Sequence, residues 1–247
     1  MASVKELYEM LAELAPVELA ESWDNVGLLV DSGRPVTSVL VTLDITPAVV
    51  EEASRLGCEL IVSHHPVIFG GLKRLSREDV SYLLVEKGIS AICMHTNLDA
   101  ADGGVNDTLA DLFGMRERVS FAEGCGRIGK IVPMSTWELA EKAQQVLHTS
   151  VKFADAGKPV EILAVISGAG GSMFEDAVAL HADCLLTGEA NHHQALDSVR
   201  LGMSLIAATH QATEWPVVSV LAQQMEKAFP QLQVQCSSTD PDPFTYI

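Results

Sequence analysis

Residues 59–69 read ELIVSHHPVIF, and this stretch indicates the fold of the chain. The run ELIVS is apolar and short, which predicts a strand buried on both faces. Two adjacent histidines, His64 and His65, follow the strand, and Pro66 favours an extended conformation at His65. In α/β sheets, ligand sites lie at the carboxyl ends of the strands. The stretch therefore predicts a parallel strand that delivers two histidines to a functional edge.

Strand-like and helix-like segments alternate on both sides of this stretch. Apolar, β-rich runs predict strands at 26–30, 38–44, 59–63, 89–95, 160–168, 182–188, 203–210 and 232–236. Helical periodicity and capping residues predict helices at 4–14, 47–57, 76–88, 105–114, 136–148, 172–181, 190–201 and 214–228. The alternation predicts an α/β fold with mostly parallel sheets covered by helices.

The two halves of the chain repeat each other in part. GCELIVS (57–63) resembles ADCLLTG (182–188), and GISAICMH (88–95) resembles GMSLIAATH (202–210). Chance similarity between buried strands is the alternative explanation. The glycine-rich segment 120–134 lacks a helical period and is the candidate junction. The sequence thus predicts two similar α/β lobes, 1–125 and 126–247, with a site in the cleft between them, or else one continuous domain.

Composition restricts the class of protein. Hydrophobic residues make up 48% of the 247 residues, enough for a substantial core, and no apolar run reaches the roughly 18 residues that span a bilayer. The first residues do not resemble a signal peptide. Five scattered cysteines without a CxxC spacing are typical of reduced, buried thiols. We therefore expect a cytoplasmic protein without membrane association.

The formal net charge of −17 disfavours nucleic acid as a partner, because an acidic surface repels phosphate backbones. Acidity also attracts divalent cations, although a solvated surface that promotes solubility is the more common reason for it.

A second group of polar residues follows the predicted strand 89–95. The segment HTNLDAADGGVND (95–107) offers one histidine and three aspartates. Asp102 precedes a glycine and is explained by a turn, and Asp107 is explained by capping of the next helix. Asp99 has no equally good local explanation, so it is the candidate metal ligand in this segment.

A third group follows the strand 203–210. His210 ends the strand and Glu214 lies four residues later, a spacing that directs both side chains to one side if the turn is helical. A glutamate in a first helical turn can instead simply favour the helix dipole.

Together, three strand ends deliver His64, His65, Asp99, His210 and Glu214. Three imidazoles and two carboxylates suit Zn, Fe, Mn or Co, and differ from the thiolates of a structural zinc site. Five ligands shared between two divalent ions leave coordination positions for water, as in a hydrolytic centre.

Other polar residues are candidates for supporting roles around the ligands. Asp24 and Asp44 can orient ligand histidines, and a turn or a helix cap is the alternative for each. His95 is either a further ligand or a hydrogen-bonded histidine near the sheet edge. Glu189 and His193 can reach the cleft as supporting or substrate-binding groups. Arg127 has a structural role or contacts a phosphate or subunit.

Several segments of the chain, in order, resemble the family of GTP cyclohydrolase I type 2 homologues, also called interacting-factor-3-like proteins. They are ESWDNVGLLV, VTLDIT, IVSHHPVIF, HTNLDAADGGVND, GRIG, LLTGEANHHQALD and THQATEW. The resemblance covers nearly the whole chain and implies the short form of the family. It implies a dinuclear metal site at the same five residues, two similar lobes and a ring-shaped homohexamer. The family commonly has a serine where this chain has Thr213, which keeps the hydroxyl.

Two classes of function follow. The first is a metal-dependent hydrolase of a nucleotide-like small molecule, with GTP ring opening suggested by the family name. The second is a non-catalytic protein that binds or delivers metal or acts with a partner protein, as the interacting-factor name suggests. A structural ring that uses metal only for stability is a third alternative. The chain has no GxxxxGK[ST] phosphate loop.

Overall fold

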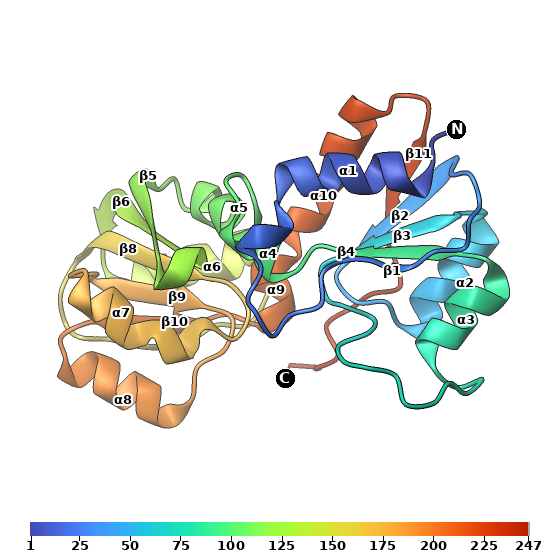
Figure 1. Cartoon of the computed structure of the whole chain (residues 1–247). Coiled ribbons are helices and arrows are strands. Elements are labelled where there is room, and N and C mark those ends of the chain that lie inside the picture. The colour runs from blue at the N-terminus through green and yellow to red at the C-terminus, as the bar shows by residue number, and fades with distance from the viewer. Residues whose placement is uncertain (247) are drawn as a thin grey trace. The chain divides into compact units, whose positions relative to one another are not determined.

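The computed structural model describes residues 1–246 and divides them into two compact units (Figure 1). Unit 1 comprises Met1–Asp102 and Val217–Pro241. Unit 2 comprises Gly103–Pro216 and the segment that starts at Asp242. The chain thus returns to unit 1 after completing most of unit 2. The boundary predicted at 125–126 falls within a β-hairpin of unit 2.

Unit 1 is built on a five-stranded sheet with the order β1-β4-β3-β2-β11. Its strands are β1 (Gly27–Val30), β2 (Ser38–Thr42), β3 (Leu60–Ser63), β4 (Ser90–Cys93) and β11 (Gln233–Cys236). Its helices are α1 (Val4–Leu14), η1 (Val17–Leu19), α2 (Pro47–Leu56), α3 (Val80–Lys87), α4 (Thr96–Ala100) and α10 (Pro216–Ala228). Only β1 runs antiparallel to its neighbour, so this sheet is mostly parallel, as predicted.

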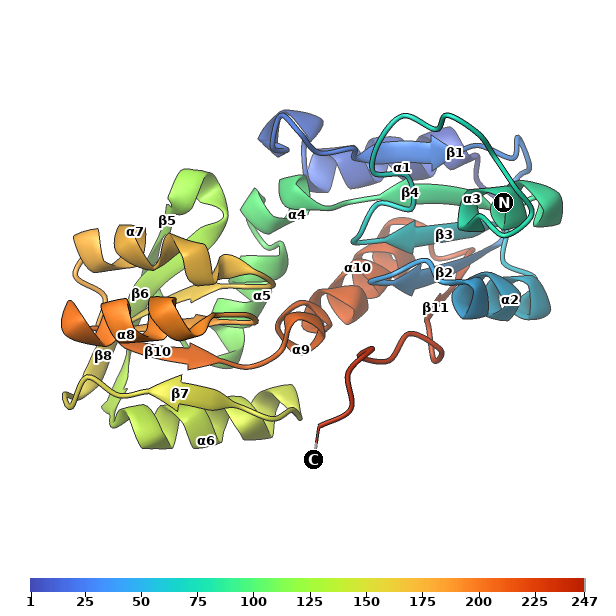
Figure 2. The ribbon, with the colours of Figure 1, turned by 90° about the horizontal axis from the view of Figure 1, so that it is seen from below.

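Helices cover both faces of this sheet. Leu40, Ile61 and Ala91 point from successive strands into a core shared with α2 and α3. On the opposite face, α1 and α10 cover the sheet (Figures 1 and 2). Every residue of β2, β3 and β4 is buried, as expected for strands covered on both sides.

Unit 2 contains a six-stranded sheet with the order β5-β6-β8-β9-β10-β7. Its strands are β5 (Arg116–Phe121), β6 (Gly126–Met134), β7 (Lys152–Ala154), β8 (Val160–Ile166), β9 (Cys184–Thr187) and β10 (Ser204–Ala207). Its helices are α5 (Val105–Leu112), η2 (Ala122–Gly124), α6 (Thr136–Leu147), η3 (Gly170–Met173), α7 (Phe174–Ala179), α8 (His192–Arg200) and α9 (His210–Glu214).

This second sheet is mixed rather than mostly parallel. Strands β8, β9 and β10 are parallel, whereas β5, β6 and β7 pair antiparallel with their neighbours. The segment 120–134, predicted as a junction, forms the end of the first strand, the turn and the second strand of the β5–β6 hairpin. Its glycines obscured the strand pattern: at Gly129 a Cβ would lie 2.6 Å from the carbonyl oxygen of Arg116, so close pairing excludes a side chain there.

The core of unit 2 also has two faces. Successive residues of β8 point to opposite sides: Leu163 packs with α5 and α6, and Ala164 packs with α7. The repeated sequence segments fall on equivalent parallel pairs, β3–β4 in unit 1 and β9–β10 in unit 2. The helix predicted at 76–88 begins only at Val80; before it, the Asp79 amide donates to the Ser76 carbonyl (3.1 Å) and closes a turn.

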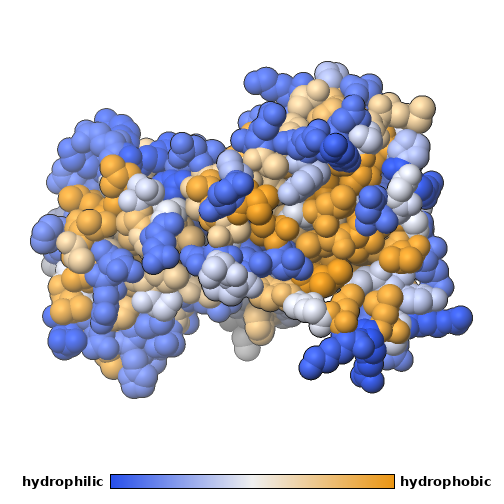
Figure 3. Space-filling model, viewed as in Figure 1, coloured by the Kyte–Doolittle hydropathy of each residue, from blue (hydrophilic) through white to orange (hydrophobic). Residues whose placement is uncertain are grey.

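The surface is mainly hydrophilic on the face shown in Figure 3, with a broad apolar area over β1 of unit 1. Among the described residues, no helix has the length and hydrophobicity needed to cross a bilayer.

A buried glutamate ties the chain after β11 to α2. The Glu52 carboxylate is 4% exposed and accepts hydrogen bonds from the Ser237 hydroxyl (2.6 Å), the Ser238 amide (3.1 Å) and the Thr239 hydroxyl (2.9 Å). Burial raises the pKa of Glu52, but these hydrogen bonds outweigh it and lower the pKa from 4.5 to about 2. The ionised carboxylate therefore stabilises the folded state.

We predict that Glu52→Gln lowers the free energy of unfolding at pH 7 by about 3 kcal/mol. Because the folded-state pKa is depressed, the contribution is fully present above pH 4.5 and is lost as the pH falls towards 2. Denaturant titrations from pH 7 to pH 2 should therefore show the two proteins converging in acid. The control Glu51→Gln removes an exposed ion pair with Lys87 and should cost less than about 1 kcal/mol. A difference in the free energy of unfolding between Glu52→Gln and wild type that stays constant from pH 7 to pH 2 would contradict this account.

Candidate functional site

Three histidines cluster at the carboxyl ends of β3 and β4 in unit 1. His64 and His65 directly follow β3, and His95 follows β4 after one residue. The ring centroids are 5.0 Å apart for His64 and His65, 5.1 Å for His64 and His95, and 5.5 Å for His65 and His95. One ligand nitrogen of each ring lies within 4.8 Å of those of the other two, so the group can hold a metal ion.

Each of these imidazoles is oriented by an oxygen acceptor at Nδ1. The partners are the Met94 carbonyl for His64 (2.9 Å), Asp44 Oδ1 for His65 (3.0 Å) and Asp24 Oδ1 for His95 (2.9 Å). A carbonyl only accepts, so Nδ1 of His64 carries the proton and Nε2 carries the lone pair. The same tautomer at all three rings directs Nε2 lone pairs to the cluster, as metal-binding histidines require.

Asp24, which accepts the hydrogen bond from His95, has a buried side chain. Its side chain is 0% exposed and also accepts from the hydroxyl and the amide of Thr96. Burial raises the pKa of the Asp24 carboxyl, but the hydrogen bonds from Thr96 and His95 outweigh it and lower the pKa. Burial and the nearby His64 lower the pKa of His95, which favours the neutral imidazole that binds metal.

Asp44 is held in place by the last part of the unit 1 chain. The Asp240 carboxylate accepts from the Thr42 hydroxyl (2.6 Å) and from the amides of Leu43 and Asp44 (2.9 Å each). These bonds fix the backbone where β2 ends, and Asp44 there accepts from His65. Asp24 and Asp44 thus each accept a hydrogen bond from a candidate histidine, His95 and His65 respectively.

Asp99 lies in the single helical turn α4, which the sequence did not predict. Its Oδ1 is 3.8 Å from Nε2 of His64, on the side of the ring that carries the lone pair. The carboxylate is largely buried, with 16% of its side chain exposed. Unit 1 therefore brings together three imidazoles and one carboxylate.

Unit 2 carries the pair His210 and Glu214. Both lie on the short helix α9 that follows β10, and Nε2 of His210 is 3.2 Å from Oε1 of Glu214. Nδ1 of His210 is paired with Glu189 Oε1 (2.9 Å), so the ring is oriented as in unit 1. Glu214 is 4% exposed. The helical turn thus directs both side chains to one side, as the i, i+4 spacing predicts.

A glycine after β8 makes room for this pair. Gly168 has φ +57°, and a Cβ there would meet the Glu214 carboxylate and lie 3.1 Å from Nε2 of His210. Its amide donates to the Thr213 hydroxyl (3.0 Å), which donates to the His210 carbonyl (2.9 Å). The hydroxyl at position 213 therefore links the β8 end to the turn that carries both candidate ligands.

The remaining candidates have other surroundings. His193 is exposed in the first turn of α8, with its ring 5.5 Å from that of His192. Arg127 is buried and donates to the Asp107 carboxylate (3.0 Å) and to the carbonyls of Gly124 and Gly126, which supports a structural role.

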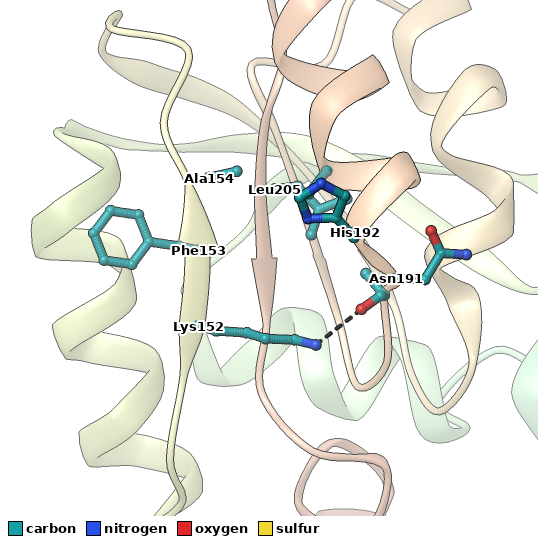
Figure 4. Close-up of a pocket in the computed structure, with 8 residues that line it drawn as sticks. Lys152, Phe153, Ala154, Asn191, His192 and Leu205 are labelled. Atoms are coloured by element: carbon teal, nitrogen blue, oxygen red, sulfur yellow. Dashed lines mark hydrogen bonds between the residues drawn. The ribbon is translucent and has the colours of Figure 1, made fainter.

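Each unit has a cavity, and the cavity of unit 1 borders a candidate ligand. In unit 1 a cavity of about 280 Å³ is bordered by His65, Asp44, Leu72 and Asp79. In unit 2 a cavity of about 270 Å³ lies between β7 and the start of α8, next in sequence to Glu189. Figure 4 shows Lys152 reaching across this second cavity to donate to the Ala190 carbonyl (2.9 Å), while Phe153 points away from His192.

Sequence reasoning missed Asp240 and Gly168. Gly168 could have been found, because it lies at the end of the predicted buried strand 160–168 and the other candidate residues also lie at the ends of buried strands. Asp240 lies in the polar segment SSTDPDP, where no pattern distinguishes it.

Comparisons with known proteins agree over the whole chain. The model of the Duf34/NIF3 family (NGG1p interacting factor 3) matches residues 2–243. The GTP cyclohydrolase 1 type 2 homolog of Streptomyces coelicolor is 34% identical, over 99% of this chain and 94% of that protein. The NGG1-interacting factor 3 of Saccharomyces cerevisiae is 30% identical over 86% of each chain. A solved structure of a Staphylococcus aureus hypothetical protein superposes with a TM-score of 0.89 at 29% identity, covering 99% of both chains.

We predict that Gly168→Ala weakens metal binding by roughly tenfold to a hundredfold, because its methyl group displaces His210 and Glu214. The matched control is Gly157→Ala, which has a similar positive φ (+77°) but nothing within 4 Å of the new Cβ. Both substitutions should lower the melting temperature through backbone strain, and only the first should change metal affinity. Titration with Mn²⁺ or Zn²⁺ measures the difference, and equal affinities in the two variants would contradict the steric argument.

Proposed function

The chain belongs to the Duf34/NIF3 family, and from this premise we propose that it is a dinuclear metal-dependent hydrolase of a nucleotide-like small molecule. The observation that carries the proposal is the common orientation of His64, His65 and His95. Each ring has Nδ1 hydrogen-bonded to an oxygen, and one ligand nitrogen of each ring lies within 4.8 Å of those of the other two.

The donor set fits divalent transition metals. Imidazole nitrogens and carboxylate oxygens suit Zn, Fe, Mn or Co. Unit 1 supplies His64, His65 and Asp99, and unit 2 supplies His210 and Glu214. We propose that these five residues act together on two ions. The support is the chemistry of each cluster and the family resemblance of the segments that contain them.

When bound, such ions polarise substrate oxygens and supply an activated water at neutral pH. The chain's own residues have separate tasks. Asp44 and Glu189 fix the rings of His65 and His210, and Asp24 fixes that of His95. His95, with Nδ1 committed to Asp24, directs Nε2 to the same cluster and can bind a ligand atom there. The cavity beside His65 is large enough for a small organic molecule.

GTP ring opening is the reaction that the names of relatives suggest, and we propose GTP as the first substrate to test. The alternative is a non-catalytic protein that binds or delivers metal or associates with a partner, as the yeast relative's name indicates. A homohexameric ring and a cytoplasmic location are further parts of the proposal.

Metal analysis tests the centre directly. After loading with Zn²⁺, Mn²⁺, Co²⁺ or Fe²⁺ and dialysis, we expect two ions per wild-type chain. His64→Ala, His65→Ala, Asp99→Ala, His210→Ala and Glu214→Ala should each lose at least one ion. The matched control is the other adjacent pair, His192→Ala and His193→Ala, which should retain both. Fewer than one ion per wild-type chain would refute the metal centre, and full retention in both unit 2 variants would restrict it to unit 1.

Turnover distinguishes a hydrolase from a metal carrier. We expect the metal-loaded protein to open the GTP ring, detected by the change in ultraviolet absorption and in product mass. EDTA should abolish the reaction, and His64→Ala and Glu214→Ala should lower kcat by at least roughly a hundredfold with the fold intact. Two retained ions with no turnover of GTP or of a nucleotide panel would favour the non-catalytic alternative.

A further inference from the structure

Two large aromatic side chains are exposed beside the unit 1 cluster. Trp23 is 58% exposed and Phe69 is 56% exposed. Their ring centroids are 6.0 Å apart and their planes differ by 14°, so the two rings lie nearly parallel. Aromatic residues make up only 5% of the chain, and an exposed parallel pair is therefore unusual here. We call these two residues the aromatic pair.

The backbone around the aromatic pair is fixed by hydrogen bonds. Asn25, two residues after Trp23, donates from its side chain to the carbonyl of Ile68, the neighbour of Phe69. Asp24 accepts from His95 and Thr96. The two segments that carry the rings are thus tied to each other and to the cluster.

The aromatic pair adjoins the histidines. The ring centroid of His95 is 6.2 Å from that of Trp23 and 6.0 Å from that of Phe69, with interplanar angles of 77° and 73°. His95 therefore meets both rings at a steep angle, edge to face, and does not itself stack on them. A ring stacked on the aromatic pair would lie within reach of groups bound by the histidine cluster.

We propose that Trp23 and Phe69 bind the planar heteroaromatic ring of the small molecule on which the metal cluster acts. This inference rests on the proposed function for the identity of the cluster as the reacting site. Stacking requires only a flat π-face, so it selects planar heterocycles without depending on their hydrogen-bonding edges.

Local charge favours a ligand that also carries an anionic group. The loop after Phe69 contains three exposed basic residues, Lys73, Arg74 and Arg77, and two acidic residues, Glu78 and Asp79, so it is positive overall in a chain with a net charge of −17. Hydrogen bonds from the Ser76 amide and hydroxyl lower the pKa of the Asp79 carboxyl, with a smaller contribution from the charge of Arg74, and Asp79 borders the cavity beside His65. A heterocycle with a phosphate or carboxylate matches an aromatic surface and a basic loop on the same segment.

The test compares guanosine 5′-monophosphate with ribose 5-phosphate, which keeps the phosphate and lacks the ring. Calorimetry on the full metal-loaded chain should show ribose 5-phosphate binding at least roughly tenfold more weakly. Trp23→Ala should weaken guanosine monophosphate binding by roughly tenfold to a hundredfold, and Trp23→Phe by less than about threefold. Phe69→Ala provides a second variant if Trp23→Ala fails to fold.

The matched control is Trp137→Ala, since Trp137 is also exposed (60%) and contacts a phenylalanine, Phe153, but lies in unit 2. It should leave nucleotide affinity unchanged. Equal losses in Trp23→Ala and Trp137→Ala, unchanged affinity in Trp23→Ala and Phe69→Ala, or no guanosine monophosphate binding by the wild type would each overturn the inference. A change in the oligomeric mass of Trp23→Ala in solution, without a change in nucleotide affinity, would also overturn it, because that result would identify a contact between copies of the chain.

Metal content measured on the same samples separates this inference from the proposed function. The aromatic pair does not include a metal ligand, so Trp23-dependent binding should persist in EDTA-treated protein. Binding that persists in a protein unable to retain metal would support the aromatic pair and refute the metal centre. Full metal content without Trp23-dependent nucleotide binding would support the metal centre and refute the role of the aromatic pair.

Discussion

The hydrogen bond from Nδ1 of each candidate histidine to an oxygen determines what the site can do. An imidazole has two nitrogens, and the acceptor at one of them decides which is left to bind a ligand. In unit 1 the acceptors are a backbone carbonyl and two carboxylates; in unit 2 the acceptor is Glu189. The strands supply the positions of the histidines, and these acceptors supply their direction.

The same construction occurs in both units. β3 with β4, and β9 with β10, are parallel neighbours whose carboxyl ends lie at one edge of each sheet. His95 follows the second of these strands in unit 1 and His210 follows the second in unit 2, and Nδ1 of each is paired with a carboxylate. The repeated sequence segments therefore correspond to a repeated arrangement of strands and polar residues.

The sequence predicted the parts of this arrangement that depend on local pattern. Buried strands are short apolar runs, so their ends, and hence His64, His65 and His210, could be located from residue types. The β5–β6 hairpin was missed because its glycines allow close strand pairing and also resemble a linker. Asp240 was missed because its role depends on a contact with residues 42–44, about two hundred positions away, which no periodicity encodes.

The return of the chain to unit 1 has a consequence for its synthesis. Unit 2 is nearly complete when residue 216 leaves the ribosome, whereas unit 1 still lacks β11 and the segment that contains Asp240. Domains that are encoded contiguously fold as they emerge. Synthesis of unit 1 begins before that of unit 2 and is completed after it. Strand β2 therefore lacks its neighbour β11 while residues 103–216 are being synthesised. The Asp240 carboxylate, which anchors Asp44 and through it the ring of His65, is therefore added only after residues 103–216.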